Sequence, residues 1–517
     1  MVYKLIVFGL YMAFVLGVGI FFFVRSKDKN EKDYFLGGRK MNGLVAAFSA
    51  GASDMSAWVL MGLPGAIAIN GLSSAWISIG LLIGTVLAWI FVAPKLRRFA
   101  IKANDSITIP QFLSNRFQAK NPTLRIASAV VFLVGYCLYS ASSIVACGDV
   151  FVAIMPSAEQ YKVLVEIVAA LIIVAYTLLG GFNAVCWTDF FQGMLMLWAL
   201  MIIPIITSVA INVNGPLAAV VTGDNYYNLL ATGKFDWTSV AQIITGLGWG
   251  LGYFGMPHIL VRYMSIKSET EMKKSQRIGI VWFIIILFFA TYVGLAGHEY
   301  LGEFITGDNK QRTFIMMVDN LFGNGALALF AGIFLAAIIA ASMSTADSQL
   351  LASSSAFSSD IYKTTVRKNA SDKEMLWVGR IAVAAILIVA VLIALFGPND
   401  IMQLVSAAWS IFGSAFGPAV LLALFWRRFN YKGACAGIIT GFAVSVLWLV
   451  LFNFEYYGFT SVVFNTQTYE IVPGFVIGLL TAVAVSFATG KPEDKVLELF
   501  DSVEKTVEEP AQNIAEE

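Results

Sequence analysis

The stretch Ser49-Ala-Gly-Ala-Ser-Asp-Met-Ser-Ala-Trp58 places an aspartate among small residues inside an apolar run over residues 44–70. A carboxylate within a membrane span is costly and usually marks an ion path or a paired site. The small residues around Asp54 allow the backbone to leave the helical hydrogen-bond ladder, which a membrane tolerates only where the backbone lines a cavity. The alternative is a helix-packing face from which Asp54 reaches the membrane interface.

The composition places the whole chain in the membrane class. Of its 517 residues, 58% are hydrophobic and 13% are charged, whereas soluble domains average about 25% charged. The charges cluster between long apolar runs, and about 20 apolar residues span a bilayer as a helix. The first run, residues 3–24, is too long for a signal-peptide core and lacks a small-residue cleavage site, so we expect a retained helix.

Thirteen spans are expected, and their flanking charges predict an orientation. The spans lie at residues 3–24, 44–70, 73–94, 124–155, 161–180, 186–211, 240–263, 277–298, 319–353, 376–396, 402–426, 433–452 and 471–489. With the N-terminus outside, the inner loops and the tail hold 29 of the 34 Lys and Arg residues, and basic residues favour the inside. We therefore expect an all-α integral membrane protein with its N-terminus outside and its C-terminus inside.

The chain divides into one transmembrane domain, residues 1–490, and an acidic tail, residues 491–517. We expect the tail to be disordered in the cytoplasm. The four cysteines lie in or at the ends of apolar runs without CxxC spacing, so they are expected to pack as small apolar residues. No stretch interleaves basic and aromatic residues on a polar face, so no nucleic-acid partner is expected. The expected partners are the small-molecule solute and the lipid bilayer, and no obligate protein partner is predicted.

A second glycine-rich segment lies in the seventh span, Thr245-Gly-Leu-Gly-Trp-Gly-Leu-Gly-Tyr-Phe-Gly-Met-Pro-His258. Three of its glycines match GxGxxG, but no strand precedes them, so a dinucleotide site is not expected. Five glycines and a proline in one span instead predict a broken helix. Trp249 and Tyr253 are four residues apart and share a face of a helical segment, where they could bind an apolar ring or an amine, or simply pack.

Polar residues also occur in two further spans. The ninth contains Ala340-Ala-Ser-Met-Ser-Thr-Ala-Asp-Ser348. Sodium is a hard cation that prefers oxygen ligands, and Ser344 and Thr345 could supply two hydroxyls, unless they bond back to their own helix. At the start of the sixth span, Thr188 or Asp189 could cap a helix, or Asp189 could lie on a sodium exit route.

The spacing of the two glycine-rich segments predicts the type of fold. They fall in the second and seventh spans, five spans apart. Broken helices at corresponding positions indicate an inverted-repeat transporter with its substrate site near the membrane midplane. The residues alone therefore predict a sodium- or proton-coupled transporter of a small solute.

These segments resemble the sodium/solute symporter family, and within it most closely the members that transport proline. The resemblance runs from Tyr34-Phe-Leu-Gly-Gly-Arg39 almost to Gly490. It is carried by Ser49-Ala-Gly-Ala-Ser-Asp-Met-Ser56, Leu60-Met-Gly-Leu-Pro-Gly65, Gly248-Trp-Gly-Leu-Gly-Tyr-Phe-Gly255, Pro257-His-Ile-Leu260, Met343-Ser-Thr345 and Gln349-Leu-Leu351. It implies a core of ten helices in two inverted five-helix repeats, with one extra helix before the core and two after it.

The resemblance also implies where ligands bind. Sodium would lie between the first and eighth core helices, held by the carbonyls of Ala52, Met55 and Ala341 and the hydroxyls of Ser344 and Thr345. Asp54 resembles the family's sodium-critical acid, and Asp189 resembles the acid along the sodium exit route. Substrate contacts would fall on Ser56, Tyr139, Trp249 and Tyr253.

The function implied is a sodium-coupled symporter that imports L-proline by alternating access across the inner (plasma) membrane, without enzymatic activity. Two positions depart from close proline carriers: Met256 stands where a glutamine is expected, and Ala57 where a glycine is expected. The alternatives are a symporter of another small solute, such as betaine or a carboxylate, and a membrane enzyme or sensor. The chain has only two histidines, with no HExxH motif or Ser/His/Asp order, and its tail is too short for a sensor's output domain.

Overall fold

The computed structural model describes residues 2–25, 31–307, 309–398, 400–453, 466 and 468–508. Within these ranges the secondary structure is helical, apart from an isolated β-bridge between Met41 and Ile266. The α-helices are α1 (Val2–Arg25), α2 (Glu31–Leu36), α3 (Gly43–Asp54), α4 (Leu63–Asn70), α5 (Trp76–Leu87), α6 (Ala93–Lys102), α7 (Ile109–Arg116), α8 (Thr123–Ile154), α9 (Lys162–Asn214), α10 (Trp237–Gly248), α11 (Pro257–Ser265), α12 (Glu269–Leu301), α13 (Thr313–Phe322), α14 (Ala328–Ser355), α15 (Asp372–Phe396), α16 (Ile401–Phe425), α17 (Tyr431–Phe452), α18 (Ile471–Ala488) and α19 (Asp494–Glu508).

The expectation of an all-α membrane protein is confirmed. Within the described ranges, ten helices are long and apolar enough to cross a membrane. The number is eleven if α3 and the segment Trp58–Asn70, which meet at an angle of 61°, form one broken span.

Two of the thirteen expected spans, 161–180 and 240–263, are not among these helices. Residues 161–180 correspond to the first part of α9, which is interrupted at Gly181. That glycine has a φ of 60°, a conformation that side chains disfavour. Residues 240–263 comprise α10, the 3-10 helix η6 (Trp249–Phe254) and α11, none of which is long enough to cross alone.

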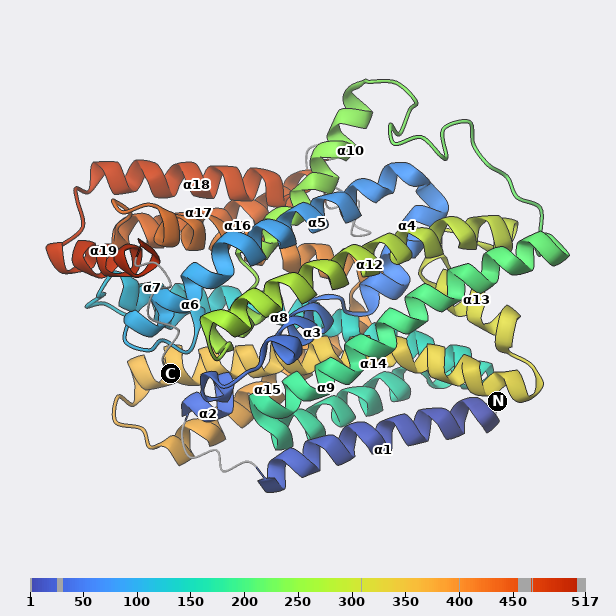
Figure 1. The fold of residues 1–517 in the computed structure, drawn as a ribbon, viewed down its shortest axis with the longest axis horizontal. Helices are drawn as coiled ribbons and strands as arrows, with labels where there is room; N and C mark the ends of the chain where they lie inside the picture. Colours follow the sequence, from blue (N-terminus) through green and yellow to red (C-terminus); the bar gives the residue numbers. More distant parts are fainter. Residues whose placement is uncertain are drawn as a thin grey trace.

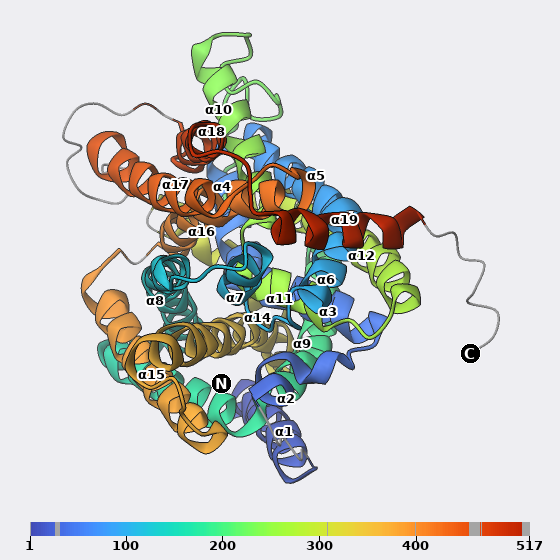
Figure 2. The ribbon, with the colours of Figure 1, turned by 90° about the vertical axis from the view of Figure 1, so that its left-hand side faces the viewer.

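The helices run mainly along one direction, so the molecule has two distinct ends (Figure 1). One end, here called the α19 end, carries α2, α6, α7 and α19, and Figure 2 looks onto it. The opposite end, here called the α13 end, carries the N-terminus, α13 and the connection between α9 and α10. Basic residues of the expected inner loops are at the α19 end: Lys95 is paired with Glu504, and Arg427 with Asp501 at 2.7 Å.

The expectation of a disordered tail is wrong for residues 494–508, which form α19. The buried side chains Val496, Phe500 and Val503 are spaced by four and three residues, so they share one helix face. Arg116 donates a hydrogen bond from Nη1 to the carbonyl of Val496 at 3.2 Å. The tail was expected to be disordered because its composition is acidic, and composition does not reveal an apolar helix face.

Asp105 anchors the polar loops at the α19 end. It accepts hydrogen bonds from Lys32 and, at 2.8 Å, from Nε of Arg39. Burial alone would raise the pKa of Asp105, but these two bonds and the two positive charges outweigh it and lower the pKa. The other guanidinium nitrogens of Arg39 donate to the carbonyls of Met264 and Ser106 at 2.5 and 2.6 Å. Arg39 lies in the short 3-10 helix Gly37–Arg39 that follows α2, so it connects this turn to the ends of α6 and α11.

Candidate functional site

The second span is broken next to its aspartate, as predicted. α3 ends at Asp54, and Met55 leaves the helical conformation with a φ of −77° and a ψ of 49°. The amide of Ser56 donates to the carbonyl of Asp54 at 2.8 Å, and the Ser56 hydroxyl accepts from the amide of Trp58 at 3.4 Å. Helical structure resumes at Trp58 as a π-helical turn. These hydrogen bonds replace part of the lost helical ladder.

The seventh span is also broken, as predicted. Between α10 and α11 the chain forms the 3-10 helix η6, and Met256 is extended. A side chain at Gly250 would have its Cβ 2.2 Å from the carbonyl oxygen of Gly80, and one at Gly252 would have it 2.0 Å from Nε1 of Trp409. Glycine is therefore required here because α5 and α16 approach the η6 backbone closely.

Asp54 lies where the two breaks meet. Its side chain is fully buried, and the hydroxyl of Tyr253 donates to Oδ2 at 2.6 Å. The carbonyl of Asp54 accepts from the Tyr139 hydroxyl and from Nε1 of Trp58, both at 3.1 Å. Oδ1 has no protein partner. The alternative in which Asp54 reaches the membrane interface is wrong, because the carboxylate is enclosed by the protein.

α14 passes beside the end of α3 and brings neutral oxygens to the same region. The Ser344 hydroxyl lies 2.8 Å from the carbonyl oxygen of Ala52 in α3 and 3.0 Å from that of Ala341 in its own helix. The hydroxyl therefore bonds back to its own helix, as one of the two interpretations predicted, and it also contacts α3. Thr345 Oγ1 is buried without a partner, and Met55 is fully buried at the end of α3. Such a group of uncharged oxygens suits a hard monovalent cation.

Aromatic rings cover the site on its other side. Tyr253 and Trp249 both contact Trp409 of α16, with ring centroids 5.2 and 6.3 Å apart. Trp249 also lies 6.1 Å from Trp58 and stacks on Tyr469 at 5.0 Å. Because η6 is a 3-10 helix, residues four apart do not share a face, and it is Trp409 between them that joins the two rings. No motif distinguishes Trp409 or Tyr469 in the sequence.

Asp189 forms a buried ion pair that sequence analysis did not predict. Its Oδ2 accepts from Nη2 of Arg262 at 2.9 Å and from the Ser49 hydroxyl at 2.6 Å. Arg262 also donates to Ser49 at 2.8 Å and to the hydroxyl of Ser348. The network, here called the Arg262 network, joins α3, α9, α11 and α14. Capping by Thr188 or Asp189 is wrong, because α9 is already helical before both residues.

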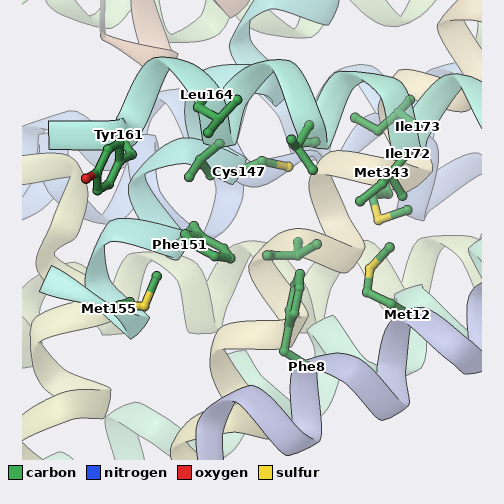
Figure 3. A pocket seen from close by; sticks show the side chains of 14 residues that line it. Phe8, Met12, Cys147, Phe151, Met155, Tyr161, Leu164, Ile172, Ile173 and Met343 are labelled. Atoms are coloured by element: carbon green, nitrogen blue, oxygen red, sulfur yellow. The ribbon is translucent and has the colours of Figure 1, made fainter. Parts of the chain in front are cut away.

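An apolar cavity of about 340 Å³ lies between α1, α8, α9 and α14 (Figure 3). Its lining includes Phe8, Met12, Cys147, Phe151 and Met343. The lining contains none of the candidate site residues, and its surface is almost entirely apolar. This cavity is therefore not the site for a charged or zwitterionic solute.

Comparisons with known proteins give relatives and a fold. The family model described as "Sodium:solute symporter family" matches residues 34–441. The chain is 42% identical over 489 residues to the High-affinity proline transporter PutP of Bacillus subtilis, covering 94% of this chain and 98% of the relative. It is 38% identical over 501 residues to the Sodium/proline symporter of Escherichia coli, covering 96% and 95%. A solved structure of a Na+-coupled sialic acid symporter in a substrate-bound outward-open state superposes with a TM-score of 0.74 at 20% identity, covering 95% of this chain and 99% of that one.

Proposed function

The chain belongs to the sodium:solute symporter family, and we propose that it carries L-proline into the cell together with sodium. Both relatives described above are named as proline transporters, and one is named for sodium as well. The chain is thus a transporter and not an enzyme. The observation that carries the proposal is the meeting of two broken helices and α14 around the enclosed Asp54.

Sodium, as the co-transported ion, binds between α3 and α14. Its ligands are the carbonyls of Ala52, Met55 and Ala341 and the hydroxyls of Ser344 and Thr345. The spacing of the Ser344 hydroxyl from two of these carbonyls, 2.8 and 3.0 Å, supports this assignment. The unpartnered Thr345 hydroxyl supports it as well. Asp54 adds negative charge beside the ion without being required as a direct ligand.

Proline binds on the aromatic side of Asp54. Its carboxylate lies near the unwound amides of the two breaks, where helix ends favour an anion. Its ring packs on Trp249 or Tyr253, and its ammonium meets carbonyls or a tyrosine face. Ser56 and Tyr139 complete the contacts, since both lie at the break beside Asp54.

The topology proposed has thirteen spans with the N-terminus outside and the C-terminus in the cytoplasm. Ten helices among the described residues are long and apolar enough to cross a membrane. The bent α3–α4 pair, the first part of α9 and the α10–α11 pair are three further spans, which gives thirteen. α1 precedes a core of two inverted five-helix repeats, and α17 and α18 follow it. The α19 end is then cytoplasmic, in agreement with its basic loops, and the membrane is the bacterial inner (plasma) membrane.

Alternating access requires one side of the site to be closed at a time. We assign the inner closure to the Arg262 network, because it links four core helices between Asp54 and the α19 end with fully buried charges. Sodium entering from outside holds α3 against α14 and orders the proline pocket. Release to the cytoplasm requires Arg262 and Asp189 to separate.

Uptake of labelled L-proline into proteoliposomes tests this function. An inward sodium gradient should drive accumulation, potassium in place of sodium should not, and Asp54→Ala should abolish the sodium-driven uptake. Unlabelled betaine and small carboxylates should compete less well than proline. Accumulation of betaine in preference to proline would retain the mechanism and replace the solute, with Met256 and Ala57 as the positions to exchange first.

A further inference from the structure

One face of α10 carries exposed apolar side chains along the whole helix. Trp237, at the first position, is 68% exposed, and Ile244 and Leu247 are exposed as well. These residues are spaced by seven and three positions, so they share one face. Phe235, two residues before the helix begins, is 79% exposed. The four residues are here called the α10 ridge, and an exposed apolar patch of this kind marks a contact with a protein or a membrane.

The opposite face of α10 is packed against the bundle. Ser239, Ala241 and Gly248 are buried there. A side chain at Gly246 would have its Cβ 2.4 Å from the Cβ of Trp76 in α5, so the two helices are in close contact. α10 therefore cannot turn to bury the ridge against the rest of the protein.

The turn before α10 is fixed by hydrogen bonds. Asp236 caps the helix: one carboxylate oxygen accepts from the amide of Ser239 at 3.0 Å, and the other accepts from the hydroxyl of Thr232 at 2.8 Å. Earlier in the same connection, the hydroxyl of Tyr226 donates to the carbonyl of Ile67 in α4 at 3.0 Å. The two aromatic residues on either side of the capping aspartate are therefore held in place by a built turn.

α10 and the turn before it lie at the edge of the molecule. In Figures 1 and 2 they leave the bundle and project past α18, whereas α5, α12 and α18 run along the common helix direction. The connection from α9 belongs to the α13 end, which is the outer end in the proposed orientation. The ridge therefore overhangs the lipid that surrounds the spanning helices.

The chemistry of the ridge fits the boundary between lipid headgroups and acyl chains. Tryptophan is enriched at this boundary, and an amphipathic helix lies in it with its apolar face buried by about 5–10 Å. Lys234 and Asp236, the neighbours of the two aromatic residues, are exposed and can stay among the headgroups. Leu247 is followed almost directly by η6 in the core of the molecule. A soluble partner could not cover a surface that continues in this way into the membrane.

We propose that the α10 ridge inserts into the headgroup–acyl boundary of the outer leaflet and anchors the outer half of the broken seventh span to the bilayer. The inference goes beyond the proposed function, because its ligand is the lipid surface and not the solute. It bears on transport because α10 continues directly into η6, which carries Trp249 and Tyr253. The bilayer thus contributes to the position of these rings beside Asp54.

A fluorescent label that reports its surroundings tests the insertion. The four cysteines are replaced by serine, Trp237→Cys is labelled with nitrobenzoxadiazole, and the full-length protein is reconstituted into phosphatidylcholine–phosphatidylglycerol vesicles. The label should be quenched by phospholipids spin-labelled near the top of the acyl chain and protected from iodide present on both sides. Asp224→Cys, at an exposed position in the same connection, is the matched control and should show the reverse. Quenching at residue 237 by iodide but not by spin-labelled lipid would overturn the insertion and indicate a surface for a soluble partner.

A label at a second position tests whether the two aromatic residues hold the helix. With the label on Ile244→Cys, the double substitution Phe235→Ser with Trp237→Ser should remove most of the quenching by spin-labelled lipid. Phe304→Ser, which removes an exposed aromatic residue outside the ridge, should leave the quenching unchanged. The double variant should melt at the wild-type temperature in detergent, which separates loss of the anchor from loss of the fold. Full quenching in the double variant would overturn the anchor.

Uptake measurements separate this inference from the proposed function. In vesicles the double variant should have a raised KM for proline, whereas its dissociation constant for proline in detergent should equal that of the wild type. An unchanged KM would overturn the link between the anchor and η6. Wild-type protein that takes up no proline would refute the proposed function, and the labelling at residue 237 would still decide whether the ridge inserts.

Discussion

Replacing Arg262 by alanine should open the inner side of the transporter. Arg262 is 2% exposed and Asp189 is fully buried, so the substitution leaves a carboxylate that keeps the Ser49 hydroxyl as a hydrogen-bond donor. Removing one partner of a buried ion pair costs about 3–5 kcal/mol. That cost falls on the inward-closed state, because water can solvate Asp189 once the inner side is open. The equilibrium should therefore shift toward the inward-open state by at least about 100-fold.

The thiol of Cys186 provides a native reporter of this opening. It is fully buried and lies three residues before Asp189, on the same face of α9. With the other three cysteines replaced by serine, its rate of maleimide labelling should rise by about two orders of magnitude in Arg262→Ala. Combining this change with Asp189→Asn should restore slow labelling, since no charge is then left unpaired.

A matched control distinguishes opening of the inner side from general loosening. Arg98 is also at the α19 end, but it pairs with the partly exposed Glu269 at 2.8 Å. A pair that water reaches contributes little, about 0–1 kcal/mol, so Arg98→Ala should leave Cys186 labelling unchanged. Unaltered labelling in Arg262→Ala, in protein that still binds proline, would refute the assignment of the Arg262 network as the inner closure.

Three further predictions concern the proposed sodium site, the proposed proline site and the loops at the α19 end. Ser344→Ala should raise the half-saturating sodium concentration for uptake about tenfold or more, whereas Ser342→Ala, whose hydroxyl bonds to its own helix at 2.9 Å, should not. Tyr253→Phe removes the donor to Asp54 and should raise the KM for proline about tenfold, so an unchanged KM in uptake assays would contradict the proposed pocket. The lowered pKa of Asp105 means that its stabilising effect is present above about pH 4 and is lost as the pH falls through the folded value. Asp105→Asn should therefore melt at a temperature that depends less on pH below about pH 4, and a melting profile that parallels the wild type there would count against this.

The two helix breaks could be predicted because their cause is local. Glycines and a proline in the seventh span, and small residues around Asp54, weaken a helix wherever it is placed. The partners of these breaks could not be predicted in the same way. Trp409 follows Gly252 by 157 positions in the numbering, and nothing in its own span marks it as the ring against which that glycine packs.

The Arg262 network was missed for a related reason. A basic residue at the end of a span is expected to face the cytoplasm, and Arg262 contributes to that count. Its pairing with Asp189 depends on how α9 packs against α11, which is a tertiary property. The helix α19 was missed because its net acidity suggests disorder, although the spacing of Val496, Phe500 and Val503 indicates an apolar face.

The central claim is that sodium and proline occupy adjoining sites coupled through α3 and α14. It is tested most directly by measuring the proline dissociation constant with and without sodium, and the sodium constant with and without proline, on the same purified protein. Coupling through a shared structure requires the two ratios to be equal, and we predict that each ligand tightens the other by the same factor. A proline affinity at the Asp54 site that is identical with and without sodium would contradict the account.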